Sequence, residues 1–170
     1  MTLTNLLVLG GARSGKSRYA QKRAEESGLR RLFVATAQPF DGEMRDRIAR
    51  HQAERAEKWE TIEAPIDLAP VIHAHAAPDT VLLIDCLTLW TSNLMLADRD
   101  MEDATRELTD ALAQAPGPVI LVANEVGLGI VPDNALARRF RDAAGILNQQ
   151  VAAIVTEVQF LAAGLPMRFK

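Results

Sequence analysis

A glycine-rich loop between an apolar strand and a helix constrains this chain more than any other feature. The apolar run Leu6–Leu9 leads directly into the segment GGARSGKS, and the residues from Lys16 to Ser27 are compatible with a helix that stops at Gly28. The segment consists of Gly10, Gly11, Ala12, Arg13, Ser14, Gly15, Lys16 and Ser17. It fits the pattern GxxxxGK[ST], in which backbone amides at a helix N-terminus surround phosphate oxygens. The sequence therefore predicts a P-loop that binds a nucleoside triphosphate.

Three side chains near this loop are candidates for phosphate and metal chemistry. In a P-loop the lysine, here Lys16, reaches the β- and γ-phosphates, and the hydroxyl of Ser17 ligates Mg²⁺. Asp85 directly follows the apolar run Val81–Ile84, an arrangement that places a carboxylate beside the metal of a P-loop. The alternative is that Asp85 only caps the next helix. We expect Mg²⁺ to be held through Ser17 and Asp85.

Apolar runs alternate with helical segments along the chain, which indicates an α/β fold. Continuous apolar runs such as Val81–Ile84 and Val119–Ala123 are typical of strands buried on both faces of a parallel sheet. The expected helices include 41–59, 66–76, 87–96, 101–114 and 135–153, and the strands 158–162 and 167–169 suggest a terminal hairpin. Ligands of such sheets bind at the carboxyl ends of the strands. The expectation is a mostly parallel central sheet with a C-terminal antiparallel hairpin.

Composition limits the classes of partner. A chain of 170 residues, 48% hydrophobic and 24% charged, predicts one domain over residues 1–170. The net charge of −3 argues against a surface that attracts nucleic acid or anionic lipid, so a bound anion needs a local site. The single Cys86 cannot form an internal disulfide, and no apolar run is long enough to span a membrane. We expect no nucleic-acid partner, no membrane insertion and a cytoplasmic location.

One charged helix carries a candidate nucleophile. In the expected helix 41–59, Arg47, His51 and Arg55 recur every fourth residue and so form one ridge. Two guanidiniums beside an imidazole disfavour its protonation and suit a phosphate, and a neutral imidazole is a competent nucleophile. The other reading is a solvated charged face. The spacing is compatible with a phosphoramidate intermediate on His51.

Other polar residues receive weaker interpretations. Asn124 and Glu125 follow the apolar run Val119–Ala123 and should reach the nucleotide edge, or they only connect a strand to a helix. His73 and His75 do not share a helix face and are expected to be exposed.

Several segments together resemble the bifunctional adenosylcobinamide kinase and adenosylcobinamide-phosphate guanylyltransferase family of cobalamin biosynthesis, the CobU/CobP family. The resemblance covers nearly the whole chain and rests on GGARSGKS, ATA, DGEMRDRIARHQAER, WETIEAP, DCLTLW and NEVGLGIVPDNALARRFRDAAGILNQ. The last segment is the most specific, because a bare P-loop fits many enzymes. Thr156 stands where the family often has an acidic residue, and no catalytic role attaches to that position.

The resemblance implies a RecA-like P-loop domain with two activities. It implies phosphorylation of adenosylcobinamide by ATP or GTP, then transfer of GMP from GTP to adenosylcobinamide phosphate, which yields adenosyl-GDP-cobinamide and pyrophosphate. The guanylyl group would be carried on His51. The implied nucleotide contacts are the loop from Gly10 to Ser17 together with Ala35, Thr36, Ala37, Gln52, Ala53, Glu54, Arg55, Glu63 and Asp85. A homotrimer with sites between subunits is also implied.

Two other functions fit the P-loop by itself. One is a P-loop kinase of another small metabolite, which would form no covalent intermediate. The other is a RecA-like ATPase or nucleic-acid-binding subunit, which the acidic balance disfavours. With one P-loop and one credible nucleophilic histidine, two activities would have to reuse one triphosphate site.

Overall fold

A seven-stranded sheet forms the centre of the computed structural model, which describes residues 3–38 and 59–170. Residues 41–58 of the expected helix 41–59, with His51, lie outside these residues, and Trp59 is described but is not in a helix. The strands are β1 (Leu6–Gly10), β2 (Arg30–Ala35), β3 (Glu60–Glu63), β4 (Thr80–Asp85), β5 (Val119–Asn124), β6 (Glu157–Ala162) and β7 (Leu165–Arg168). Their order is β3-β2-β4-β5-β1-β6-β7, and within it only the β6–β7 pair is antiparallel.

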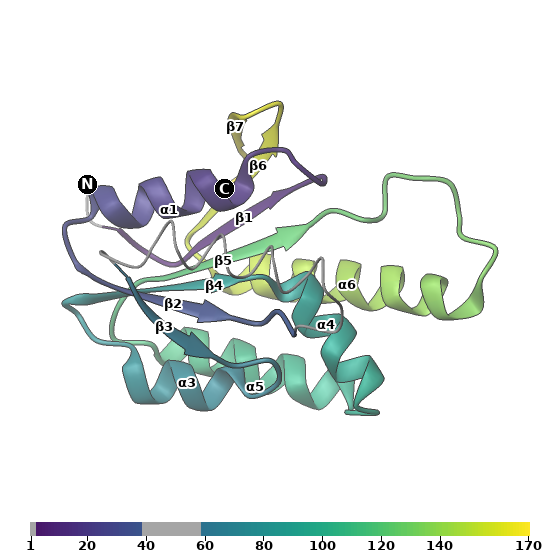
Figure 1. Ribbon diagram of the computed structural model, residues 1–170, viewed down its shortest axis with the longest axis horizontal. Coiled ribbons are helices and arrows are strands. Elements are labelled where there is room, and N and C mark those ends of the chain that lie inside the picture. Colours follow the sequence, from purple (N-terminus) through teal and green to yellow (C-terminus); the bar gives the residue numbers. More distant parts are fainter. Residues whose placement is uncertain (1–2, 39–58) are drawn as a thin grey trace.

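Helices cover both faces of the sheet (Figure 1). The described helices are α1 (Lys16–Glu26), α3 (Leu68–His75), α4 (Leu87–Leu96), α5 (Met101–Gln114) and α6 (Ala135–Ile154). Helix α1 packs on one face with its small residues Ala20 and Ala24, whereas α3, α4, α5 and α6 contribute to the core on the other. This layered architecture confirms the predicted α/β class with a mostly parallel sheet.

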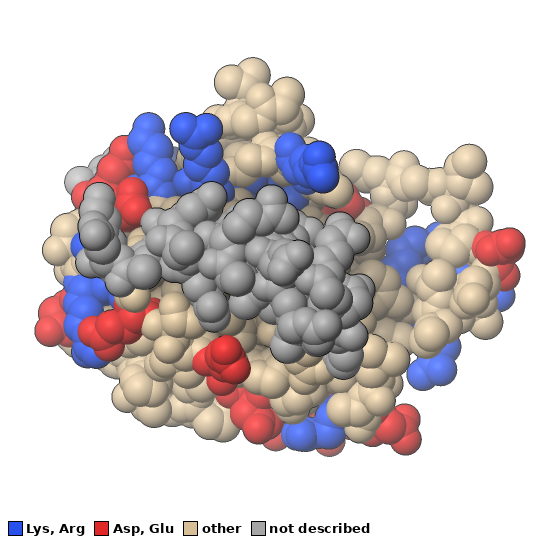
Figure 2. Space-filling model, in the orientation of Figure 1, with Lys and Arg blue, Asp and Glu red and all other residues tan. Residues whose placement is uncertain are grey.

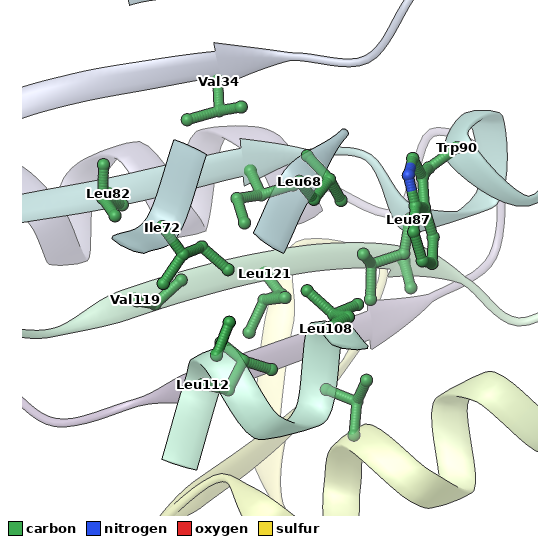
Figure 3. Packing of buried hydrophobic residues seen from close by; sticks show 14 of the residues in the cluster. Val34, Leu68, Ile72, Leu82, Leu87, Trp90, Leu108, Leu112, Val119 and Leu121 are labelled. Carbon is green, nitrogen blue, oxygen red and sulfur yellow. The ribbon is translucent and has the colours of Figure 1, made fainter. Parts of the chain in front are cut away.

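The core explains why β4 and β5 have no polar face. Both strands are buried along their apolar lengths, as strands covered on two sides must be. Figure 3 shows Leu82 of β4 and Leu121 of β5 facing Ile72 of α3 and Leu108 of α5. Burial of each such side chain stabilises the fold by about 1.5–3 kcal/mol. The carboxyl ends of these rigid strands therefore hold fixed positions.

The C-terminal hairpin is confirmed, but its turn is shorter than the sequence suggested. We expected the second strand at 167–169, whereas β7 begins at Leu165. Ala163 and Gly164 both have positive φ, of 53° and 79°, as in the two-residue type I′ turns that join antiparallel strands. Pro166 is tolerated inside β7 because an edge strand does not need every backbone N–H.

The residues just before α6 and α3 determine where these two helices begin. Helix α6 begins after Asn134, whose side-chain oxygen accepts hydrogen bonds from the backbone N–H groups of Leu136 and Ala137 at 2.8 and 3.2 Å. The helix expected over 66–76 is two residues shorter at its start, since Asp67 is its N-cap residue.

Candidate functional site

The loop between β1 and α1 has the backbone that phosphate binding requires. Gly10 and Gly15 have φ values of 151° and 95°, which side-chain-bearing residues rarely adopt. A Cβ on Gly10 would also lie 2.4 Å from the carbonyl oxygen of Leu161. Gly10 is therefore required by both conformation and space, and Gly15 is required by its conformation.

Lys16 lies inside this loop rather than in solvent. Its residue is 7% exposed, and its ammonium donates hydrogen bonds to the Gly11 carbonyl oxygen and, at 3.5 Å, to Ser14 Oγ. Burial lowers the pKa of Lys16, and the nearby Cys86 and Asp85 partly offset that effect. Burial also raises the pKa of Cys86 to about 11, so the thiol is neutral near pH 7.

Basic side chains surround the loop although the chain is acidic overall. Arg13 and Arg18 are exposed, and Figure 2 shows Lys and Arg side chains along the edge of the molecule over α1. The N-terminus of α1 adds further positive potential. The region therefore has the local positive charge that an anion site needs in a chain that is acidic overall.

A buried hydrogen-bond network fixes the end of β4 against the end of β2. The Thr36 hydroxyl donates to the Cys86 carbonyl oxygen at 2.8 Å and accepts from the Cys86 N–H at 2.7 Å. Asn93 of α4 donates to the carbonyl oxygens of Thr36 and Pro65, at 2.7 and 2.9 Å. The fully buried Thr36 side chain is therefore used to hold Asp85 and Cys86 in place. Ala35 and Ala37, beside it, are partly exposed.

Glu63 lies at the carboxyl end of β3, the outer strand on the far side of the sheet from the hairpin. It ends β3, in register with Ala35, and lines a pocket of about 350 Å³ together with Pro65, Ile66, Asp67, Val71, His75 and three others. The lining combines apolar and proline surfaces with two carboxylates. Such a pocket suits a flat apolar group that carries hydrogen-bond donors.

The sheet order sets the spacing between the P-loop and this pocket. Strands β5, β4 and β2 separate β1 from β3, so four interstrand steps of about 4.8 Å separate the end of β3, which carries Glu63, from the end of β1 by about 19 Å. Asp85 of β4 lies between them. A ligand that contacts both places has to be elongated, as a nucleoside triphosphate is.

The end of β5 lies beside the P-loop, as its sequence suggested. Asn124 is in register with Gly10, and the Glu125 N–H donates to the Gly10 carbonyl oxygen at 3.0 Å. The Asn124 N–H donates to Thr88 Oγ1 at 2.7 Å. Neither Thr88 nor Asn93 was singled out from the sequence, because a polar residue inside an apolar helix segment carries no signal of its partner.

An apolar loop projects from the sheet after β5. Leu128, Ile130 and Val131 are 85%, 96% and 62% exposed, and Leu136 at the start of α6 is 54% exposed. Figure 1 shows this connection extending away from the layers of the fold. Exposed apolar side chains gathered in one segment are typical of an interaction surface.

Several candidate residues cannot be placed. His51, Gln52, Ala53, Glu54 and Arg55 lie outside the described residues. His73 and His75 are exposed, as expected. Within residues 3–38 and 59–170, no three His, Cys, Asp or Glu side chains gather into a metal cluster, and no described helix could cross a membrane.

Comparison with known proteins agrees with the geometry. The sequence model described as cobinamide kinase / cobinamide phosphate guanyltransferase matches residues 6–169. The chain is 51% identical over 166 residues to the bifunctional adenosylcobalamin biosynthesis protein CobP of Pseudomonas aeruginosa, and the match covers 96% of each chain. It is 42% identical to CobU of Escherichia coli, covering 97% of this chain and 99% of the relative.

Solved structures confirm the fold at much lower sequence identity. An ATPase of a bacterial type III secretion system superposes with a TM-score of 0.59 at 11% identity, covering 97% of this chain and 56% of that one. At such identity the match shows a RecA-like P-loop fold and nothing finer. The family match and the two relatives show more: this chain belongs to the cobinamide kinase and cobinamide phosphate guanyltransferase family, CobU.

Proposed function

We propose that the chain phosphorylates adenosylcobinamide with ATP or GTP and then transfers GMP from GTP to adenosylcobinamide phosphate through a guanylyl group on His51. The observation that carries the proposal is that the P-loop, Lys16 and Asp85 lie together at the carboxyl ends of the strands. The end of β3, which carries Glu63, lies about 19 Å from the end of β1 on the same side of the sheet. The family supplies the two activities, and this side of the sheet supplies one elongated nucleotide site that both can use.

The P-loop is the phosphate end of this proposed site. Its amides and the Lys16 ammonium would hold the β- and γ-phosphates. Burial lowers the pKa of Lys16, and the negative charge of the phosphates would raise this pKa again. The hydroxyl of Ser17 and the carboxylate of Asp85 are hard oxygen donors, which suit Mg²⁺. Two protein ligands are what Mg²⁺ commonly takes when phosphates and water complete its shell. When bound, Mg²⁺ would neutralise charge on the phosphates.

The pocket at Glu63 is the proposed base end. A purine fits against Pro65 and Ile66, and the Glu63 carboxylate can accept hydrogen bonds from the N1–H and amino group of guanine. Adenine presents no N1–H donor. The pocket therefore gives GTP an advantage over ATP in the guanylyl transfer, where the base must be guanine.

The transfer itself needs a nucleophile at the α-phosphate. In the proposal a neutral imidazole nitrogen of His51 attacks the α-phosphorus, the bond to the bridging oxygen of the β-phosphate breaks, and pyrophosphate leaves with the electron pair. A phosphate oxygen of adenosylcobinamide phosphate then attacks the same phosphorus, and the P–N bond breaks. Arg47 and Arg55, on the same sequence ridge, would stabilise the charge on the attacked phosphate.

Covalent labelling with GTP tests this step. Incubation with GTP labelled at the α-phosphate should give a protein-bound label that is lost in acid and kept in base, as phosphoramidates are. The label should be absent in His51→Ala. A P-loop kinase without a covalent intermediate would give no label and no pyrophosphate.

The chain supplies its own control for this experiment. His73→Ala removes another histidine, which is exposed on α3 and does not line the pocket at Glu63, and this variant should label like the wild type. A label that persists in His51→Ala would contradict the assignment. DNA-stimulated nucleotide hydrolysis would instead support the ATPase alternative.

Assembly and location complete the proposal. We propose that the active enzyme is in the cytoplasm. We also propose that it is a homotrimer, because the family resemblance implies trimers with sites between subunits. The exposed apolar side chains of Leu128, Ile130 and Val131 support a subunit contact at this loop. Closure of a site around a corrinoid by a neighbouring subunit would suit a chain of this size.

A further inference from the structure

The turn of the C-terminal hairpin touches the P-loop, and this contact has no role in the chemistry described above. Strand β6 is parallel to β1, and Leu161 is in register with Gly10, where β1 ends. The turn Ala163–Gly164 follows β6 beyond that point and therefore runs beside the loop. Figure 1 shows the β6–β7 hairpin next to the start of α1.

One hydrogen bond joins the turn to the loop. The Gly164 N–H donates to the Ser14 carbonyl oxygen at 2.9 Å, and a Cβ placed on Gly15 would lie 3.3 Å from Gly164 Cα. In a type I′ turn the N–H of the second central residue points out of the hairpin, so it is free to bond elsewhere. Here its acceptor is the peptide unit that links Ser14 to Gly15.

The orientation of that peptide unit matters for phosphate binding. In a trans peptide the C=O and the following N–H point in opposite directions. When Gly164 holds the Ser14 C=O on the hairpin side, the Gly15 N–H must point away from the hairpin. A P-loop binds phosphate through backbone amides such as this one.

The hairpin is anchored firmly enough to act in this way. Arg23 of α1 donates two hydrogen bonds, at 2.7 and 2.8 Å, to the carboxylate of Glu157 at the start of β6. The β1–β6 ladder fixes the strand along its length. The hairpin therefore contacts the P-loop unit at both ends, through Glu157 near the end of α1 and through Gly164 at the loop.

We propose that Gly164 is a positioning residue for triphosphate binding, because its backbone N–H orients the Ser14–Gly15 peptide so that the Gly15 N–H faces the phosphates. The inference rests on the proposed triphosphate site. It gives the β6–β7 hairpin a role in orienting the P-loop.

Replacing the Gly164 amide with an ester tests this role with little change of shape. Glycolic acid at position 164, introduced by nonsense suppression, removes the N–H and keeps the backbone flexible. The Kd of a β,γ-imido analogue of GTP should rise about tenfold, since an amide aimed at an anion is lost from its best orientation. In turnover the KM for GTP should rise likewise, and kcat should change less than twofold.

The same ester at Gly28 is the matched control. Gly28 also has positive φ, of 70°, and its N–H also donates a hydrogen bond, to the Glu25 carbonyl oxygen, but it does not touch the loop. Both esters should lower the urea midpoint similarly, and only the one at 164 should weaken binding. Gly164→Val and Gly28→Val repeat the comparison by straining each backbone.

Each possible outcome is decisive. Binding by the 164 ester within twofold of the wild type would overturn the inference, and so would an equal loss of binding in the Gly28 ester. If the wild-type protein itself fails to bind the analogue, the proposed function is wrong and the inference falls with it. Wild-type binding is measured first, so the two failures are distinguishable.

Discussion

The P-loop and the loop after β5 both follow neighbouring strands, yet they differ in how completely the chain surrounds them. The P-loop is held in place by contacts within its own chain: Lys16 is buried, Gly10 lies against Leu161, and Ser14 is hydrogen-bonded to the hairpin turn. The loop after β5 instead presents Leu128 and Ile130 to solvent, at 85% and 96% exposure.

The difference separates two requirements of the enzyme. Binding of phosphate needs amides and an ammonium fixed before the ligand arrives, and one chain can supply them all. Removal of exposed leucine and isoleucine side chains from water is favourable, and it requires another surface that covers them. Local changes should therefore impair the P-loop, whereas changes in the loop after β5 should impair the proposed assembly of subunits.

Lys16→Ala should produce the largest effect. Loss of the ammonium should lower kcat/KM for both phosphorylation and guanylyl transfer by about 10³-fold, because charge on the phosphates is no longer neutralised. The urea midpoint should not fall, since the buried ammonium is desolvated in the folded state. Steady-state assays and urea denaturation measure the two quantities.

A nearby exposed lysine provides the control for this variant. Lys22 of α1 pairs with Glu26 at the surface, at 3.6 Å, so Lys22→Ala should leave both activities within twofold of the wild type. If Lys16→Ala kept near-normal α-label incorporation from GTP, the P-loop would not be the phosphate end of the guanylyl-transfer site.

A double variant of the projecting loop tests the other region. Leu128→Ser with Ile130→Ser should dissociate the proposed homotrimer and reduce guanylyl transfer by about tenfold or more, since each buried side chain contributes roughly 1.5–3 kcal/mol. Sedimentation velocity gives the mass, and the α-label assay gives the activity.

The control for the loop variant is another exposed apolar side chain. Leu96, at the end of α4, is 66% exposed, so Leu96→Ser should change neither mass nor activity. A loop variant that keeps the wild-type mass would show that this surface does not join subunits.

The two regions were also unequally predictable from the sequence. GGARSGKS identified the P-loop and the positions of Lys16 and Ser17, because conformation and chemistry reside in adjacent residues. The alternation of apolar runs likewise predicted the sheet, with Asp85 and Asn124 at strand ends. Such features are local, so they can be read without tertiary contacts.

What the sequence could not supply are the contacts between distant segments. Gly164 lies 150 residues from Ser14, and nothing in its own neighbourhood indicates a partner. The Thr36 hydroxyl depends on the backbone of Cys86, and Asn93 closes a network across three elements. The hairpin turn was placed too late because Pro166 suggested a break, whereas the edge position of β7 tolerates it.

The smallest effect concerns the ion pair that ties α1 to β6. Arg23 and, to a smaller extent, Gln159 donate hydrogen bonds to Glu157. These bonds outweigh the opposing effect of burial and lower the pKa of Glu157 to about 2, against an ordinary value near 4.5. A depressed carboxyl pKa contributes stability above pH 4.5 that is lost as the pH falls toward 2.

Glu157→Gln removes this contribution. The variant should be less stable than the wild type by roughly 1–3 kcal/mol at pH 7, and the difference should shrink below pH 4.5 and vanish near pH 2. Urea denaturation over this pH range measures it. Glu60→Gln is the control, because the Glu60–Arg30 pair is at the surface and should contribute little despite its 2.6 Å separation. If both variants lost the same stability at pH 7, the tie to β6 would be an ordinary surface pair, and the order of the P-loop would have to come from the Gly164 contact and the β1–β6 ladder alone.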